Sequence, residues 1–193
     1  MTTELTTELS AAAAGLAPRA DDEFGMSPQD FKLAFRNHPA GVSIVSADAG
    51  DGPVALTATS VFSISAEPPL LVFSVSRLSS AAATILCADT VVVHLLGADQ
   101  LDLARLCATS GIDRFADTAR WGRLETGEPY FHGVPVWVRG RIVNRFEAGA
   151  STVVVVHALE AQLPDDCRVE AVRPLVYHNR AWHGLSDWSK LPG

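Results

Sequence analysis

The spacing of hydrophobic and polar positions changes several times along the chain, and most of the chain has the period of strands. Apolar and β-branched runs bounded by Gly, Pro or Asp predict strands at 42–47, 54–60, 62–65, 70–76, 91–96, 134–146, 152–159 and 171–177. Alternation is clearest at 134–146. One face of that strand is expected to hold Val134, Val136, Val138, Ile142 and Phe146, and the other Arg139, Arg141 and Arg145.

Three short segments have the period or the boundary signals of helices instead. In the first, Ser27 can cap, Pro28 suits the first turn, and Asp30 complements the helix dipole. This helix is expected to end at Asn37-His38-Pro39. Two further helices are expected at 79–87, which opens with serines, and at 99–108.

The order of these elements limits the fold class. A parallel sheet needs a helix after nearly every strand, and the sequence has too few helices for that. We therefore expect a mainly β fold, a closed antiparallel β-barrel with a few short helices. Residues 1–25 have a different composition and are expected to be a tail, followed by one domain at 26–186 and a C-terminal tail at 187–193.

Composition limits the cellular locations and the binding partners that we expect for this protein. The chain has 193 residues, is 48% hydrophobic, and has a formal net charge of −7, which argues against a broad nucleic-acid or membrane surface. No apolar run approaches the roughly 20 residues that span a bilayer, and the N-terminus does not resemble a secretory signal. Three scattered cysteines (Cys87, Cys107 and Cys167) indicate reduced thiols and a cytoplasmic location. The histidines lack the spacing of metal ligands, so no metal centre is expected.

Candidate chemistry is concentrated in two hydroxyl-rich segments, 57–65 and 74–80. Hydroxyl groups, Arg77 and the start of the next helix together could hold an anion such as a phosphate. The alternative is that these residues only line strands and cap a helix, because Thr and Ser are common in both places. Composition alone leaves both interpretations open.

Several short motifs give the sequence a family resemblance. They are Phe35-Arg36, the run 39–46, Thr57-Ala58-Thr59-Ser60, Glu67-Pro68-Pro69-Leu70, Asp102-Leu103-Ala104, Asp113-Arg114-Phe115 and Pro174-Leu175-Val176-Tyr177. In this order and spacing they resemble the short-chain flavin reductases, the reductase components of two-component flavin monooxygenases. The resemblance covers roughly residues 28 to 185.

The resemblance implies a homodimeric split β-barrel that binds flavin in a groove near the dimer interface. It implies hydride transfer from NADH or NADPH to FMN or FAD, after which reduced flavin reaches a partner monooxygenase. The flavin-binding residues that it implies are Thr57, Ala58, Thr59, Ser60, Ser74, Ser76, Arg77, Ser80, Arg114, Phe115 and Trp182.

Two stretches depart from the family pattern. Where family members usually have Gly-Asp-His, whose histidine contacts the nicotinamide, this chain has Gly149-Ala150-Ser151. Ser151 marks the catalytic position, and His183 is expected to take over part of the electrostatic role. Ala81 and Ala83 stand where the family commonly has hydroxyls near the phosphate, with Ser79 and Ser80 as the nearest substitutes.

These departures leave three hypotheses open. The chain is a flavin reductase with an atypical nicotinamide site, or it binds flavin for other chemistry. The third hypothesis is a split barrel that has lost flavin and binds another small molecule, as a non-redox biosynthetic enzyme could.

Overall fold

The computed structural model describes residues 25–164 and 172–192. The expected N-terminal tail at 1–25 lies outside the described residues except for Gly25, and Cys167 also lies outside them. The chain divides into two units, 1–35 and 36–193. No helix in the described ranges is long and apolar enough to cross a membrane.

Helix α2 (Pro28–Arg36) forms where the sequence predicts it. The Asp30 N–H donates to the Ser27 hydroxyl over 3.1 Å, and that hydroxyl donates back to the Asp30 carboxylate over 2.7 Å. These reciprocal bonds satisfy an N–H group that the first helical turn would leave without a partner. Phe31 and Phe35 pair on one face, with ring centroids 4.7 Å apart. The predicted capping role of Ser27 is confirmed.

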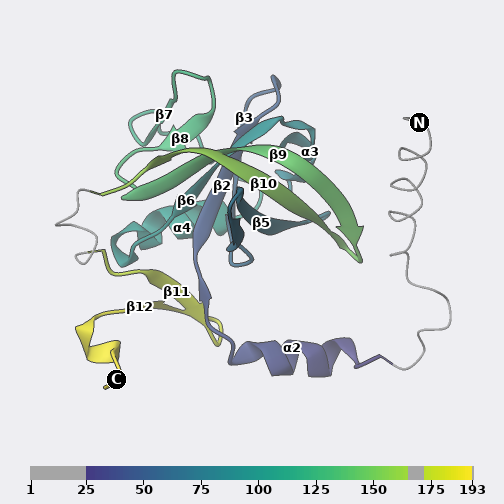
Figure 1. The fold of residues 1–193 in the computed structure, drawn as a ribbon, viewed down its shortest axis with the longest axis vertical. Coiled ribbons are helices and arrows are strands. Elements are labelled where there is room, and N and C mark those ends of the chain that lie inside the picture. Colours follow the sequence, from purple (N-terminus) through teal and green to yellow (C-terminus); the bar gives the residue numbers. More distant parts are fainter. Residues whose placement is uncertain (1–24, 165–171, 193) are drawn as a thin grey trace. The chain divides into compact units, whose positions relative to one another are not determined.

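The second unit is mainly β, as the alternating pattern predicts (Figure 1). Its strands are β1 (Ala40–Gly41), β2 (Ser43–Asp48), β3 (Pro53–Ala58), β4 (Phe62–Ala66), β5 (Pro69–Ser76), β6 (Thr90–Leu95), β7 (Trp121–Arg123), β8 (Pro129–Phe131), β9 (Val136–Ala148), β10 (Ser151–Gln162), β11 (Leu175–His178) and β12 (Ala181–Gly184). Its helices are α3 (Ala82–Cys87) and α4 (Leu101–Ala108), with single 3-10 turns η2 (Ala98–Gln100) and η4 (Asp187–Ser189).

One antiparallel sheet of seven strands organises this unit, in the order β3-β2-β6-β9-β10-β5-β4. The long neighbours β9 and β10 cross the middle of Figure 1. The mainly β fold with a few short helices is confirmed. The hydrogen-bonded order among the described residues is open, with β3 and β4 at its edges, so the predicted closure into a barrel is not confirmed.

The sheet curves around a first apolar core, to which both its central and its outer strands contribute. This core includes Val45, Leu56, Phe73, Val93 and Val154, and Ile85 of α3 packs into it. A second core, on the other side of β2 and β3, is covered by α4, β8 and β11 and includes Ile44, Leu103, Phe115, Phe131 and Leu175. Over β2 and β3, these elements therefore cover the face of the sheet opposite the first core. This packing holds α4 beside β3.

The predicted facing of β9 is wrong for its second half, and a β-bulge is the reason. Val155 pairs with Asn144, but the next residue, Val156, pairs with Ile142, so Val143 is an extra residue in β9. An extra residue reverses the alternation beyond it. Ile142 is therefore buried, whereas Phe146 is 45% exposed on the opposite face.

Helix α3 is shorter than the sequence predicts. It begins at Ala82 rather than at Ser79, because residues 76–80 form a turn first. In that turn the Ser79 N–H donates to the Ser76 carbonyl and the Ala82 N–H to the Ser79 carbonyl, each over 3.0 Å. The serines at 79 and 80 are therefore turn residues, and their side chains are available for other contacts.

Candidate functional site

The turn at 76–80 follows β5, whose alternation decides where its serines point. Phe73 and Val75 are buried in the first core, so Ser74 and Ser76 lie on the opposite face of the sheet. Ser76 pairs across the strands with Ser151, the first residue of β10. The structure therefore brings together Ser76, expected to bind flavin, and Ser151, which marks the catalytic position.

Three hydroxyls of this turn are used as hydrogen-bond acceptors. The Leu78 N–H donates to Ser76 Oγ, and the Ala81 N–H donates to Ser79 Oγ, each over 3.3 Å. Arg114 Nη1 donates to Ser80 Oγ over the same distance. Because guanidinium and amide nitrogens only donate, each serine keeps its own proton for another acceptor. The turn thus presents a set of hydroxyl donors suited to an anion with several oxygens.

Arg114 holds this turn against the end of α4. Its Nε donates to the Cys107 carbonyl over 3.2 Å, and its Nη2 to the Thr109 carbonyl over 2.8 Å. A cation is favourable at these carbonyls because the helix dipole is negative at its C-terminus. Arg114 and Ser80, both expected to bind flavin, are therefore in direct contact.

The segment 57–60 divides into structural and accessible groups. The Thr57 hydroxyl donates to the Ala104 carbonyl of α4 over 2.7 Å, and Ala58 is buried in the first core. Ser60 Oγ accepts from the Ser74 N–H over 3.0 Å and lies 3.3 Å from the Ser74 carbonyl, which joins the β3–β4 turn to β5. Thr59 is exposed. Of the hydroxyls in this segment, that of Thr59 is therefore the most accessible to a ligand.

Arg77 contacts the β9–β10 hairpin rather than Ser80. Its Nη2 donates to the Gly149 carbonyl over 3.0 Å and lies 3.3 Å from Glu147 Oε2, and its backbone N–H donates to the Ala150 carbonyl. The Arg77 and Glu147 side chains are 52% and 79% exposed, so solvent screens the pair. These contacts fix the hairpin tip beside the 76–80 turn.

Phe115 and Trp182, which were also expected to bind flavin, both make contacts with other aromatic rings. Phe115 is buried, with its ring stacked on Phe131 at 5.1 Å and edge-on to Trp121 at 5.0 Å, so it supports the second core. Trp182 packs edge-on against Tyr177 at 4.8 Å.

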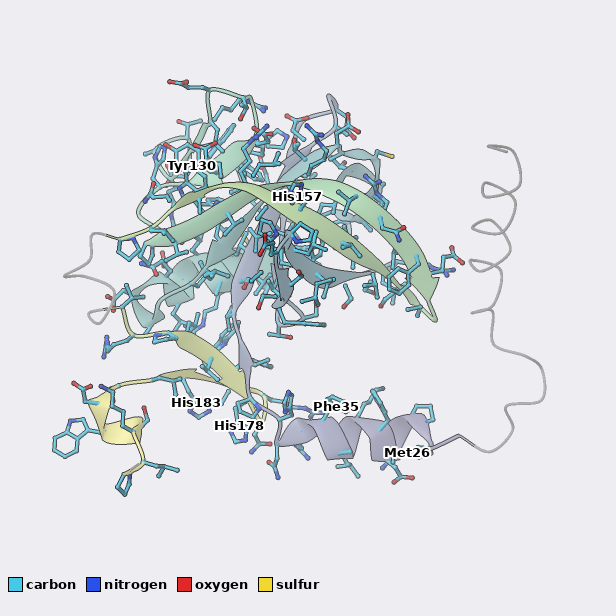
Figure 2. The ribbon with its side chains drawn as sticks, viewed as in Figure 1. Met26, Phe35, Tyr130, His157, His178 and His183 are labelled. Carbon is cyan, nitrogen blue, oxygen red and sulfur yellow. The ribbon has the colours of Figure 1, made fainter. Side chains whose placement is uncertain are left out.

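Within a single chain, His183 does not lie beside Ser151. His183 lies on β12 with its ring 5.6 Å from that of His178 (Figure 2). The adjoining β11 bonds through Leu175 to Leu96, next to where β9 begins, whereas Ser151 pairs with Ala148, where β9 ends. The 13 residues of β9 separate these two places.

Cys107, whose carbonyl accepts a hydrogen bond from Arg114, does not supply a nucleophile. Burial raises the pKa of the Cys107 thiol to about 12, although Arg114 and Arg120 oppose the shift. The thiol is therefore protonated near neutral pH and unreactive. The chemistry that this site offers is anion binding by hydroxyls and guanidinium groups.

Several contributors could not be found from the sequence. The carbonyls of Ala104, Cys107 and Thr109, which orient Thr57 and Arg114, have no sequence signal because every residue has a carbonyl. Glu147 reaches Arg77 only through the register of β5, β10 and β9. The strand alternation could have suggested this register, but only with the strand order known.

Comparisons with known proteins agree with this architecture. The sequence model of the family described as "Flavin reductase like domain" matches residues 35–186. The NADH:FMN oxidoreductase of Rhodococcus qingshengii is 40% identical over 161 residues, which cover 82% of each chain.

Solved structures agree as well. The flavin reductase domain protein from Arthrobacter sp. FB24 superposes with a TM-score of 0.76 at 34% identity, covering 83% of this chain and 96% of that one. BorF, the flavin reductase component of a bacterial two-component tryptophan halogenase, gives a TM-score of 0.72 at 28% identity, covering 83% of this chain and 99% of that one. The family match spans well over half of the sequence. This chain is therefore a member of the flavin reductase family.

Proposed function

We propose that this protein is an NADH-dependent FMN reductase that supplies reduced flavin to a separate monooxygenase. The observation that carries the proposal is the 76–80 turn, where three serine hydroxyls keep their protons and Arg114 lies against one of them. This donor set fits the phosphate of FMN, whose oxygens only accept hydrogen bonds near neutral pH. The Rhodococcus relative, named an NADH:FMN oxidoreductase, supports the choice of FMN and NADH over FAD and NADPH.

The residues of the chain bind and orient, while the bound flavin and nicotinamide supply the redox chemistry. Ser76 and Ser80 donate to the phosphate, Arg77 offsets part of its charge, and Arg114 lies against Ser80. Ser74 and the accessible hydroxyl of Thr59 face the ribityl chain and ring, and Thr57 and Ser60 fix the strand ends that carry them. Holding two reactants in one orientation is the main contribution a protein makes to hydride transfer between them.

The β9–β10 tip is our candidate for the nicotinamide side of the site. Ala148, Gly149 and Ala150 carry no group that gains or loses a proton, and Ser151 supplies a neutral hydroxyl beside Ser76. Arg77 holds this tip in place through the Gly149 and Ala150 carbonyls. The chain thus orients the nicotinamide here by shape and hydrogen bonding, without a charged histidine.

We further propose that two copies of the chain pair through the uncovered face of β4, β5, β10 and β9. Strand register places five apolar side chains on this face, namely Phe62, Val72, Val155, Val153 and Phe146. Among them Phe62 is 59% and Phe146 45% exposed, and Ser74 and Asn144 lie between the apolar side chains. Arg141 and His157 continue the same face beyond Val155. Because the apolar part of this face complements itself across a two-fold axis, a second copy is the occupant that it fits.

We also propose a split-barrel arrangement, an oxygenase partner and a cytoplasmic location. The Ser60–Ser74 bonds join the β3–β4 turn to β5, which supports a barrel closed by side chains where the strand ladder stays open. BorF, named as one component of a two-component halogenase, supports an oxygenase partner. Cys87 and Cys107 are free thiols, which supports a cytoplasmic location.

The experiment is an anaerobic flavin titration followed by NADH. We expect the protein to bind FMN, which is seen as quenching of flavin fluorescence. A catalytic amount of the protein should then allow NADH to bleach the visible absorbance of an excess of FMN. A reaction without protein sets the background rate.

The other outcomes separate the remaining hypotheses. Binding of FMN without bleaching by NADH or NADPH would indicate a flavin-binding protein with other chemistry. A lack of binding to both FMN and FAD would favour a barrel that takes a different small molecule.

A further inference from the structure

Arg114 makes three hydrogen bonds, and only one of them points toward the proposed phosphate site. Its Nε and Nη2 donate to the Cys107 and Thr109 carbonyls, and its Nη1 donates to Ser80 Oγ. The guanidinium group is planar, so two bonds to the backbone fix the plane in which the third nitrogen lies. The end of α4 therefore sets the direction from which Arg114 approaches Ser80.

This contact determines which way the Ser80 hydroxyl can act. A serine hydroxyl has one proton and two lone pairs, and arginine has no acceptor. Ser80 Oγ must therefore accept from Arg114, and its own proton points away from the guanidinium group. The hydroxyl of the adjacent Ser79 accepts from a backbone N–H within the turn. Ser80, in contrast, is oriented by the Arg114 side chain, 34 residues further along the sequence.

We propose, building on the proposed function, that Arg114 is a positioning residue that acts on FMN through Ser80. It holds the Ser80 hydroxyl as a proton donor to the flavin phosphate, while its charge is mostly engaged by the α4 carbonyls. The two residues then form one unit, and removal of either should cost the same interaction. Arg114 thereby contributes to the preference for a phosphorylated flavin over riboflavin.

A double-mutant cycle tests this unit by flavin binding alone. The dissociation constants for FMN and for riboflavin are measured by fluorescence quenching for the parent, Ser80→Ala, Arg114→Met and the double variant. We expect each single variant to weaken FMN binding about tenfold or more, because a hydrogen bond to a charged acceptor is lost. The double variant should bind FMN within about twofold of Ser80→Ala, since coupled residues are not additive.

Riboflavin separates positioning from a general loss of structure. It lacks the phosphate, so its dissociation constant should change less than about twofold in Arg114→Met. Arg120→Met is the matched control, because Arg120 pairs with Asp102 of α4 and not with Ser80. The affinity of this variant for FMN should equal that of the parent. Arg114→Lys should restore little, because one ammonium group cannot reproduce the planar three-way contact.

Two results would overturn the inference. Losses that multiply in the double variant would mean that Arg114 and Ser80 act independently. Equal losses for FMN and riboflavin in Arg114→Met would mean that Arg114 only stabilises the loop. If the parent itself binds no FMN, the proposed function fails as well, whereas the first two outcomes leave it standing.

Discussion

His94 is fully buried, and both nitrogens of its ring bond to the backbone. The Phe131 N–H donates to Nε2 over 3.1 Å, so Nε2 carries no proton, and Nδ1 lies 3.2 Å from the Ile44 carbonyl, to which it donates. Adding a proton to Nε2 would place two donors against each other. Burial accordingly lowers the pKa of His94 from the ordinary 6.5 to about 4.

Stability should therefore fall as the solution is acidified. Above about pH 6.5 both native and unfolded chains hold His94 neutral, and below it the unfolded chain takes up a proton that the native chain excludes until about pH 4. Between about pH 7 and pH 5 this linkage should remove about 2 kcal/mol from the free energy of unfolding. Urea unfolding of the parent and of His94→Gln at both pH values measures it.

The substituted chain should lose that pH dependence while being less stable at neutral pH. His132→Gln is the control, because His132 is exposed, and it should keep the slope of the parent. Asp48 and Glu128 have pKa values below their usual range, because hydrogen bonds outweigh the effect of burial. Both carboxyl groups therefore titrate below the range from pH 7 to pH 5. An unchanged slope in His94→Gln would assign the proton uptake to another group.

At the scale of elements, β9 and β10 pack closely at one glycine. A Cβ placed on Gly140 would lie 2.3 Å from Val156 Cγ1 and 2.8 Å from the His157 carbonyl oxygen. Both distances are shorter than real contacts, and a backbone oxygen in a strand cannot move aside easily. The pairing of these two strands therefore depends on the absence of a side chain at Gly140.

Gly140→Ala should lower the free energy of unfolding by about 1–3 kcal/mol, the usual cost of overpacking. Gly41→Ala is the matched control, because nothing lies within 4 Å of a Cβ there, and its effect should stay within about 0.5 kcal/mol. Chemical denaturation of both variants makes the comparison. Equal stability of Gly140→Ala and the parent would show that β10 can shift to accommodate the methyl group.

The elements themselves could be predicted well from local patterns. Alternation and turn residues predicted β2 to β6 within a few residues, and Ser27 predicted the start of α2, because these signals lie within a few positions of one another. The bulge at Val143 could not be predicted, because it depends on how β9 pairs with β10. The facing of Phe146 was wrong for that reason.

For the candidate site, the sequence indicated residue types but not the contacts between them. Ser80 and Arg114 were both expected to bind flavin, yet their contact joins positions 34 residues apart through the end of α4. Thr57 was expected to present a hydroxyl, but its proton is donated to the Ala104 carbonyl. The direction of a hydroxyl depends on its partner, and sequence spacing does not reveal the partner.

At the scale of the whole molecule, the proposed pairing of two copies can be tested through Phe146. Phe146→Asp introduces a charge into an apolar face, and each such charge meets the same face of the other copy across the two-fold axis. We expect the parent to have a mass of twice 20.5 kDa and the variant to be a monomer, as measured by sedimentation equilibrium.

Leu191→Asp is the control for this experiment. Leu191 is 89% exposed but lies outside β4, β5, β9 and β10, so the substitution should leave the dimer intact. A parent of 20.5 kDa at every concentration would overturn the pairing.

The exposed 76–80 turn has a consequence for how long a ligand stays. Most of the donors it offers are neutral hydroxyls at the surface, and Arg77 is screened by solvent and by Glu147. Neutral, water-accessible contacts break quickly, so the residence time on such a turn is short. A carrier that must hand its cargo to another protein needs that property, because a tightly held cofactor would never reach the acceptor.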